Sequence, residues 1–380
     1  MLWSSVFAVV GLVGFSSQLT YQEALANTRS FAESGKLDEA IALAEELVEA
    51  EPEMGPAYLM LGDLYRRVWR PREAIETFSR ALEETSLPPA DLHREMAVTY
   101  AELHDWDRAL ARAELSLELA PDDPQGLFTK AMVLSQKGTR GEALRLYESL
   151  LEADPDNESL HFRVGEIQES LQRLEEAEAA YRRVIELEPG HQGARFRLGQ
   201  MLLADGRSVE AERELARAVK ISVGHAASHL ELAKTYEALG RNAKAKHHYE
   251  RAIALDPWLA NAHMSYGNYA LRNGDEELGR SHLERFKELT ETSDRISALV
   301  DAVEFEPDDA DAKDALVDFL VDKKQFPLAL RMTQRFVLAA PDDPHGHALM
   351  VRIYDAWGRV EDASRARAHV AERFPDATRR

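Results

Sequence analysis

The 380-residue chain contains no cysteine. Disulfide bonds, thiolate metal sites, cysteine nucleophiles and covalently attached c-type haem are therefore excluded. Positive charge is also scarce, because 46 Lys and Arg residues stand against 67 Asp and Glu residues and leave a formal charge of -21. A chain of this charge repels phosphate backbones and acidic membrane surfaces at long range, so nucleic acid is not expected as a partner.

Long apolar runs are also scarce, and the one run of note lies at the N-terminus, from Leu2 to Phe15. A bilayer span needs about 20 apolar residues, whereas this run has the length of a signal-peptide core. We therefore expect residues 1–20 to be a secretory signal and the protein to be exported to a bacterial periplasm or cell envelope. Because no Lys or Arg precedes the run, two alternatives stay open: an uncleaved membrane anchor, or a capping helix or mispredicted start in a cytoplasmic protein.

Sequence motifs of known enzymes are missing as well. The chain has no GxSxG elbow, no Walker loop, no GxGxxG and no HExxH. We therefore expect a protein that is not an enzyme, with no cofactor, no metal and no small-molecule substrate. A folded chain is nevertheless expected, because 45% of the residues are hydrophobic and 30% are charged, which is the composition of a protein with a sizeable core.

What the sequence does contain is an internal repeat with a period of 34 residues, marked by a recurring small residue. The recurring positions are Ala40, Ala74, Ala109, Ala143, Ala177, Ala211, Ala245, Gly279, Ala329 and Ala363. A glycine lies five residues earlier in six of these units, at Gly35, Gly138, Gly206, Gly240, Gly274 and Gly358. Because glycine ends helices and permits the chain to reverse, each unit is expected to contain a turn at this point.

Each unit has the apolar period of two helices. In the second unit Leu61 and Tyr65 mark one helix, and Ala74 and Phe78 mark the next. The small residue lies where the second helix approaches the first closely, and the large residue four positions later fills the space beside it. One such hairpin is too small to bury its own apolar faces, so neighbouring hairpins must stack.

This pattern resembles the tetratricopeptide repeat. The second unit carries the signature of that family at Tyr58, Leu61, Gly62, Tyr65, Ala74, Phe78 and Ala81. The seventh unit carries it at Leu232, Ala233, Tyr236, Ala245, Tyr249, Ala252 and Pro257. The resemblance covers residues 21 to 377 and implies an all-α protein, a right-handed α-solenoid of stacked helix-turn-helix repeats.

The repeats are not continuous along the chain. The period fails between Thr290 and Pro307, where the sequence has room for one helix instead of a pair. The expected organisation is therefore eight repeats in residues 21–293, a single-helix interruption in residues 294–309, and two further repeats with a C-terminal cap in residues 310–377.

Two groups of side chains that resemble metal ligands have a simpler interpretation. Pairs of acidic residues, such as Asp122 and Asp123, occur where a new helix begins, and we expect them to cap free backbone N–H groups instead of binding calcium. Four histidines lie in the seventh repeat, at His225, His229, His247 and His248. They do not have the spacing of a known metal site, so we expect packing and surface histidines there.

The first helix of each repeat has one apolar stripe that packs against neighbouring helices. A second stripe of side chains lies one residue further round the same helix. In the fourth repeat Phe128 and Met132 belong to it. The resemblance to the family implies that these positions line a concave groove that receives peptides. The candidate groove residues are Leu59, Phe128, Met132, Phe162, Glu166, Phe196, Gln200, Leu230, Lys234, Met264 and Asn268. The alternative is that each apolar residue merely packs against a helix of the next repeat.

The function expected from these features is that of a protein-interaction scaffold, which binds an extended or helical segment of a partner protein in the groove. The lysine, asparagine and arginine clamp of heat-shock co-chaperones in the family is absent, because Leu59 with Asp63 and Phe162 with Glu166 occupy matching places. The alternative function is an architectural subunit of a larger cell-envelope assembly that packs through its helix edges. The sequence does not identify the partner.

Overall fold

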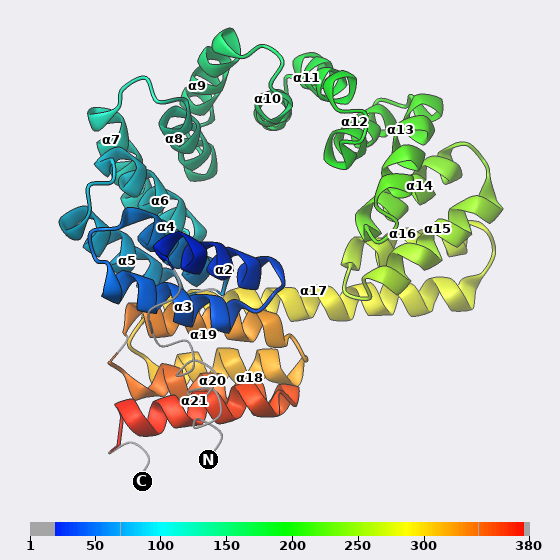
Figure 1. Ribbon diagram of the computed structural model, residues 1–380. Helices are drawn as coiled ribbons and strands as arrows, with labels where there is room; N and C mark the ends of the chain where they lie inside the picture. The colour runs from blue at the N-terminus through cyan, green and yellow to red at the C-terminus, as the bar shows by residue number, and fades with distance from the viewer. Residues whose placement is uncertain (1–19, 69, 341, 376–380) are drawn as a thin grey trace. The chain divides into compact units, whose positions relative to one another are not determined.

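The computed structural model describes residues 20–68, 70–340 and 342–375, and within these ranges the chain forms twenty helices and no strand (Figure 1). The predicted all-α fold of stacked helix-turn-helix repeats is confirmed. The apolar run from Leu2 to Phe15, and with it the expected signal, lies outside the described residues. The chain divides into two compact units, residues 1–180 (unit 1) and residues 181–380 (unit 2).

Unit 1 consists of helices that pack in pairs, each against the next along the chain. The helices are α2 (Tyr21–Glu33), α3 (Leu37–Ala50), α4 (Gly55–Arg67), α5 (Pro71–Glu84), α6 (Pro89–Glu102), α7 (Trp106–Leu119), α8 (Pro124–Lys137), α9 (Arg140–Ala153) and α10 (Glu158–Ser170). The boundary between the units falls within the next helix, α11 (Leu174–Leu187). Even-numbered helices up to α16 are the first helices of their repeats, and the odd-numbered ones are the second helices.

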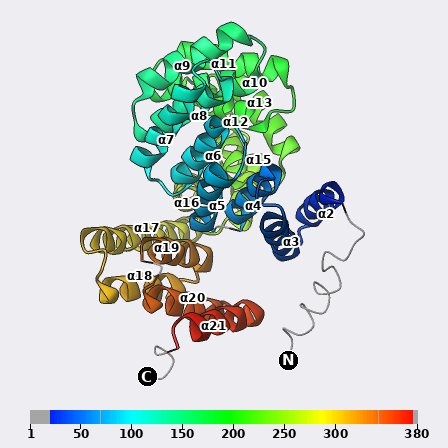
Figure 2. The same cartoon turned by 60° about the vertical axis from the view of Figure 1, so that its left-hand side comes forward.

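Unit 2 continues the pairing and ends in four short helices that follow one another in order (Figure 2). Its helices are α12 (Gln192–Ala204), α13 (Ser208–Ile221), α14 (Ala226–Ala238), α15 (Asn242–Leu255), α16 (Ala260–Arg272), α17 (Glu276–Phe305), α18 (Ala310–Asp322), α19 (Phe326–Ala339), α20 (Pro344–Trp357) and α21 (Val360–Arg373). First helices also contact each other directly, as α12 contacts α14 and α14 contacts α16.

Helix α17 differs from the expected single-helix interruption at residues 294–309. It is one uninterrupted helix of 30 residues, so residues 294–305 extend the second helix of the eighth repeat and do not form a separate helix (Figure 1). The physical reason is that no glycine or proline lies between Gly279 and Pro307 to end the helix. Its first part packs on α16, and Leu299 and Val303 in its last part pack in a core with Leu316 of α18.

The recurring small residue lies at the closest approach of two helices. Nine of the ten positions are alanines with 0% exposure, which confirms the predicted packing role. The first helix contributes a small residue too. A Cβ atom added to Gly62 of α4 would lie 2.3 Å from two ring carbons of Phe78 on α5, well inside van der Waals contact. Small and large side chains therefore interlock between the helices of one repeat.

The turns within the repeats also follow the sequence. All six recurring glycines have positive φ, for example +98° at Gly138, as the left-handed end of a helix requires. Three repeats place another residue there, and His104, Gln172 and Lys324 adopt φ values of 59°, 60° and 56°. A side chain in this conformation costs about 1 kcal/mol or more, so these three turns are held by their surroundings.

The acidic loops cap helices as predicted. Asp123 accepts hydrogen bonds from the backbone N–H groups of Gln125 and Gly126, at 3.3 and 2.8 Å. Asn157, Asp309 and Asp343 cap α10, α18 and α20 in the same way. In the part of the chain that the structure describes, no group of three or more potential ligand side chains is placed to hold a metal ion. Nor does any helix there combine the length and apolar character that crossing a membrane requires.

Candidate functional site

A hollow of about 340 Å³ opens in unit 1 between the first helices α6, α8 and α10. It is lined by Val98, Ala101, Glu102, His104, Trp106, Met132, Ser135, Gln136, Tyr147, Arg163 and Glu166. We call it the first-helix hollow. It contains two of the predicted groove residues, Met132 and Glu166, and its volume falls in the range of small binding pockets.

The base of the first-helix hollow is aromatic. Tyr147 of α9 is 1% exposed, and its ring meets the half-buried ring of Phe128 edge to face, with centroids 5.5 Å apart. Burial raises the pKa of Tyr147 to about 12, so the phenol stays neutral. Phe128 therefore supports the hollow through Tyr147, and Met132 adds a flexible apolar side chain to the lining.

The rim of the first-helix hollow holds a second aromatic pair. Trp106, the first residue of α7, packs edge to face against His104 in the preceding turn, with ring centroids 5.2 Å apart. His104 occupies the place where six other repeats have glycine, and it adopts the left-handed backbone conformation there. The hollow therefore combines an apolar base with an aromatic rim, as sites that grip one large side chain do.

The charged groups of the first-helix hollow are paired within the protein. Arg163 donates to Glu166 at 2.9 Å, and both belong to α10. Arg66 of α4 reaches Glu102 at 2.7 Å and Glu95 at 3.0 Å. Because these charges already have partners, the hollow is poorly suited to binding a free ion. The paired groups can still orient a ligand through polar contacts.

The predicted groove residues of unit 1 are all half-buried. Phe162 of α10 and Leu59 of α4 are half-buried, as Phe128 is, but they do not line the first-helix hollow. They are therefore neither fully exposed anchors nor fully buried core. The structure brings Phe128, Met132 and Glu166 to one place and leaves Leu59 outside it.

The predicted groove residues of unit 2 lie on α12, α14 and α16. Leu230 is only 3% exposed, so it belongs to the core, as the packing alternative anticipated. Phe196 is half-buried and packs edge to face on His225, with centroids 5.2 Å apart. Lys234 pairs with Glu231 at 3.0 Å. The remaining residues of this set, Gln200, Met264 and Asn268, are half-buried.

Sequence reasoning missed much of the first-helix hollow. Trp106 and Tyr147 come from second helices, whereas the predicted groove residues all lie on first helices. One signal was available, because His104 replaces the recurring glycine of the turn. A large residue at a position that favours glycine indicates a local constraint.

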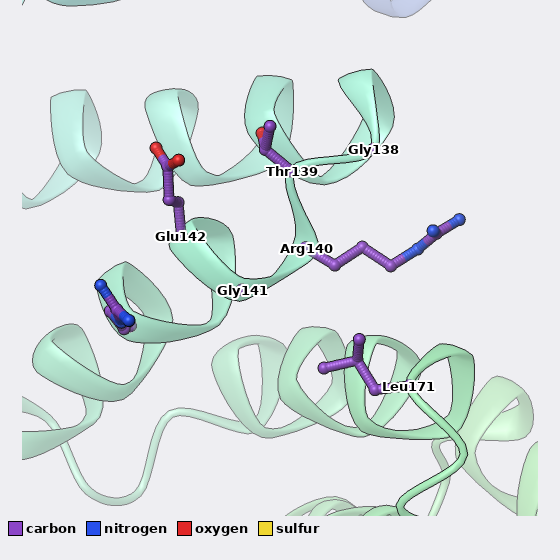
Figure 3. A pocket seen from close by; sticks show the side chains of 7 residues that line it. Gly138, Thr139, Arg140, Gly141, Glu142 and Leu171 are labelled. Atoms are coloured by element: carbon purple, nitrogen blue, oxygen red, sulfur yellow. The ribbon is translucent and has the colours of Figure 1, made fainter.

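A second hollow, of about 410 Å³, lies at the turn between α8 and α9. It is lined mainly by turn residues from Gly138 to Glu142, with Leu171 on the opposite side. Figure 3 shows that Arg140 and Glu142 extend in different directions and do not converge on one point. This hollow is therefore a weaker candidate than the first-helix hollow, because a binding site needs polar groups aimed at a common ligand.

Comparison with protein families finds the same kind of repeat along much of the chain. Models described as tetratricopeptide repeat match residues 31–90, 94–158, 128–191, 169–226 and 226–257. Together these ranges cover more than half of the sequence.

Curated relatives match only part of this chain. The human protein O-mannosyl-transferase TMTC3 is 29% identical over 138 residues, which are 35% of this chain and 15% of that protein. The cytochrome c-type biogenesis protein CycH of Rhizobium meliloti is 31% identical over 117 residues, which are 30% of this chain and 31% of that protein. The chain therefore spans less than a third of the length of either relative.

Solved structures with a similar arrangement of helices include three helical-repeat proteins. MamA from Desulfovibrio magneticus is 21% identical, with a TM-score of 0.43 over 46% of this chain and 98% of that chain. YrrB, described as a TPR protein with an unusual peptide-binding site, is 26% identical, with a TM-score of 0.40 over 50% of this chain and 96% of that chain. PilF of Pseudomonas aeruginosa is 17% identical, with a TM-score of 0.48 over 53% of this chain and 91% of that chain.

Proposed function

The chain belongs to the tetratricopeptide repeat family, and on this premise we propose that it is a non-enzymatic scaffold that binds an extended or helical segment of a partner protein along its first helices. The observation that carries the proposal is the first-helix hollow of unit 1. Its aromatic base and rim suit one large apolar side chain of the bound segment, and Glu166 and Gln136 at its edge offer polar contacts to the segment's backbone.

Electrostatics favour a basic segment for this role. Residues 20–180 contain 16 Lys and Arg residues and 34 Asp and Glu residues, a formal charge of -18, whereas residues 181–375 contain 28 and 32, a formal charge of -4. Much of the acidity of unit 1 lies on second helices, as in α3, which carries five acidic residues and no basic one. This field attracts a basic partner at long range and raises its association rate more than it strengthens contacts within the hollow.

The non-enzymatic part of the proposal rests on the chemistry of the same site. Glu102 and Glu166 are held in ion pairs by Arg66 and Arg163. The phenol of Tyr147, with a pKa of about 12, does not lose its proton near neutral pH. With both carboxylates paired and the phenol neutral, these three groups suit binding better than acid–base catalysis.

A second candidate function is the architectural subunit, in which the helix edges pack into a larger assembly. Large apolar side chains that lie away from the groove positions favour it. Leu119 is 56% exposed at the end of α7, Val223 is 68% exposed after α13, and Phe305 is 83% exposed at the end of α17. These side chains come from second helices and turns, so such an assembly would leave the first-helix hollow open.

We also propose that the protein is exported. The support is the apolar run of residues 2–15, which has the length of a signal-peptide core. If residues 1–20 are not a signal, the protein is cytoplasmic or anchored by this segment. The peptide-binding role is the same in either place.

The proposed function is tested by selecting binders from a random displayed peptide library on the full chain and measuring their affinity by fluorescence anisotropy. We expect the selected peptides to combine basic residues with one large apolar residue. Trp106→Ala should weaken binding about thirtyfold, because loss of a central aromatic anchor costs about 2 kcal/mol.

The matched control is Trp258→Ala, since Trp258 is 40% exposed in a turn of unit 2, where Arg285 stacks on its ring. This variant should bind the peptides with unchanged affinity. Equal affinity of wild type and Trp106→Ala, in a variant that melts as the wild type does, would show that the hollow is not the binding site.

A further inference from the structure

Two pairs of histidines join the helices of successive hairpins in unit 2. The Nδ1 atoms of His229 on α14 and His248 on α15 are 2.9 Å apart. The Nδ1 atoms of His263 on α16 and His282 on α17 are also 2.9 Å apart. His229 and His263 are 5% and 6% exposed, and their partners are half-buried. Each pair therefore forms a largely buried hydrogen bond that ties a first helix to its second helix.

Backbone oxygens determine which nitrogen atoms carry hydrogen in these pairs. Nε2 of His229 lies 3.3 Å from the carbonyl oxygen of Val223, and Nε2 of His263 lies 3.2 Å from that of Pro257. Because a carbonyl oxygen only accepts, both Nε2 atoms donate, and in a neutral ring the Nδ1 atom is then an acceptor. His248 must therefore donate from Nδ1 to His229. The second pair has the same arrangement.

Either site of protonation weakens this arrangement. A first proton on a pair leaves one Nδ1–H between the two rings and keeps the hydrogen bond, but it puts a charge on a buried or half-buried ring. A second proton places two Nδ1–H groups head to head and breaks the hydrogen bond. Both steps therefore favour states in which the hairpin opens to water.

The titratable and charged groups around the pairs are mainly basic side chains. Arg251, His247 and His225 act on His229, and Lys244 and His247 act on His248, which also packs against the ring of Tyr236. Arg285 and the acidic Asp256 act on His263, and His263 itself acts on His282. Burial is the largest effect and lowers the pKa of all four imidazoles, that of His248 to about 4.

We propose that the two imidazole pairs are proton-binding sites that loosen the α14–α15 and α16–α17 hairpins in mildly acidic solution. In the preceding repeat, the same two positions form an interhelical contact that contains no imidazole. There Arg195 and Glu214 form a buried ion pair between α12 and α13. In unit 1 the corresponding His161 lies 19 residues before Ala180, which offers no imidazole partner.

The direction of the effect follows from proton linkage. The unfolded chain binds a proton on each imidazole near pH 6.5, whereas the folded pairs resist it until the pH is lower. The contribution of the pairs to stability is therefore complete above about pH 6.5 and is lost progressively as the pH falls below that value. For His248 alone, this loss raises the unfolding equilibrium constant at most about 300-fold.

The proposal is tested by urea denaturation of the full chain at constant ionic strength between pH 7.5 and 5, followed by circular dichroism. The test variant carries His229→Arg with His248→Glu and His263→Arg with His282→Glu, which copy the Arg195–Glu214 pair into both hairpins. Between pH 6.5 and 5 the unfolding equilibrium constant of the wild type should rise as its stability falls. That of the test variant should rise by a factor at least ten times smaller. His161→Gln is the control and should keep the wild-type dependence.

An equal loss of stability in wild type and test variant would overturn the proposal. A second measurement applies even if the variant does not fold. NMR titration of the histidine ring carbons in the wild type should show four imidazoles that take up protons at lower pH than histidines of an unfolded chain, assigned by His248→Gln and His282→Gln. Titration of these four rings near pH 6.5, as in an unfolded chain, would equally refute the proposal.

Discussion

Replacing Gly62 by alanine tests the close packing that builds every repeat. The added Cβ would lie 2.3 Å from Cε1 and Cζ of Phe78, whose ring is 1% exposed and has no room to move. Overpacking of a core costs about 1–3 kcal/mol, and so short a contact belongs at the upper end. Alanine in place of glycine returns about 1 kcal/mol of helix propensity, so the net loss of unfolding free energy should be about 2 kcal/mol.

A matched control exists in α9. Gly141 is exposed in the first turn of that helix, and an added Cβ there meets nothing within 4 Å. Gly141→Ala should therefore stabilise the protein by about 0.5–1 kcal/mol. Both variants are measured by urea denaturation followed by circular dichroism, and hydrogen exchange should locate the loss in α4 and α5 first, because repeats support mainly their neighbours.

A further variant separates the contact from the position. Phe78→Leu removes the two ring carbons that clash, so Gly62→Ala should cost at least 1 kcal/mol less in that background than in the wild type. If Gly62→Ala and Gly141→Ala change the stability by the same amount and in the same direction, the packing argument is wrong.

Two other predictions concern the second helices and the N-terminus. Ala211 is 0% exposed between α12 and α13, so Ala211→Leu should lower the unfolding free energy by about 1–3 kcal/mol, and an unchanged thermal melt would contradict the assigned register. If residues 1–20 include a cleaved signal, N-terminal sequencing of protein from its native host should begin near Ser17, and an intact Met1 on soluble cytoplasmic protein would exclude export.

The repeated part of the fold is predictable because one physical requirement recurs in every unit. Two helices that cross closely exclude all but the smallest side chains at the crossing, so Ala40 and Ala177 mark the same contact in distant repeats. The turn adds a second requirement, a left-handed residue, which Gly35 and Gly138 satisfy without strain. These constraints act locally in sequence, and they therefore appear in the sequence as a period.

The sequence was harder to interpret where no recurring residue marks the structure. The break in the period after Thr290 suggested a separate element, yet the lack of glycine and proline simply lets α17 continue to Phe305. The exposure of each groove residue could not be predicted either, because it depends on how the next repeat packs. Leu230 is buried and Phe128 is half-buried, although both occupy the same place in their repeats.

The first-helix hollow was only partly predictable for a related reason. Met132 and Glu166 follow from the helical stripe, but Trp106 enters the hollow from the start of a second helix. No period in the sequence connects these positions. Such a site depends on how three repeats stack, and the identity of one turn residue, His104, was the only local sign of it.

The most direct test of the proposed function is a map of where a selected peptide touches the protein. A photo-crosslinking amino acid is placed at Met132 in the first-helix hollow or at the exposed Leu119 at the end of α7, and the crosslinked peptide is identified by mass spectrometry. We predict crosslinking from position 132, abolished by an excess of unlabelled peptide, and none from position 119. Crosslinking from position 119 alone would contradict binding along the first helices.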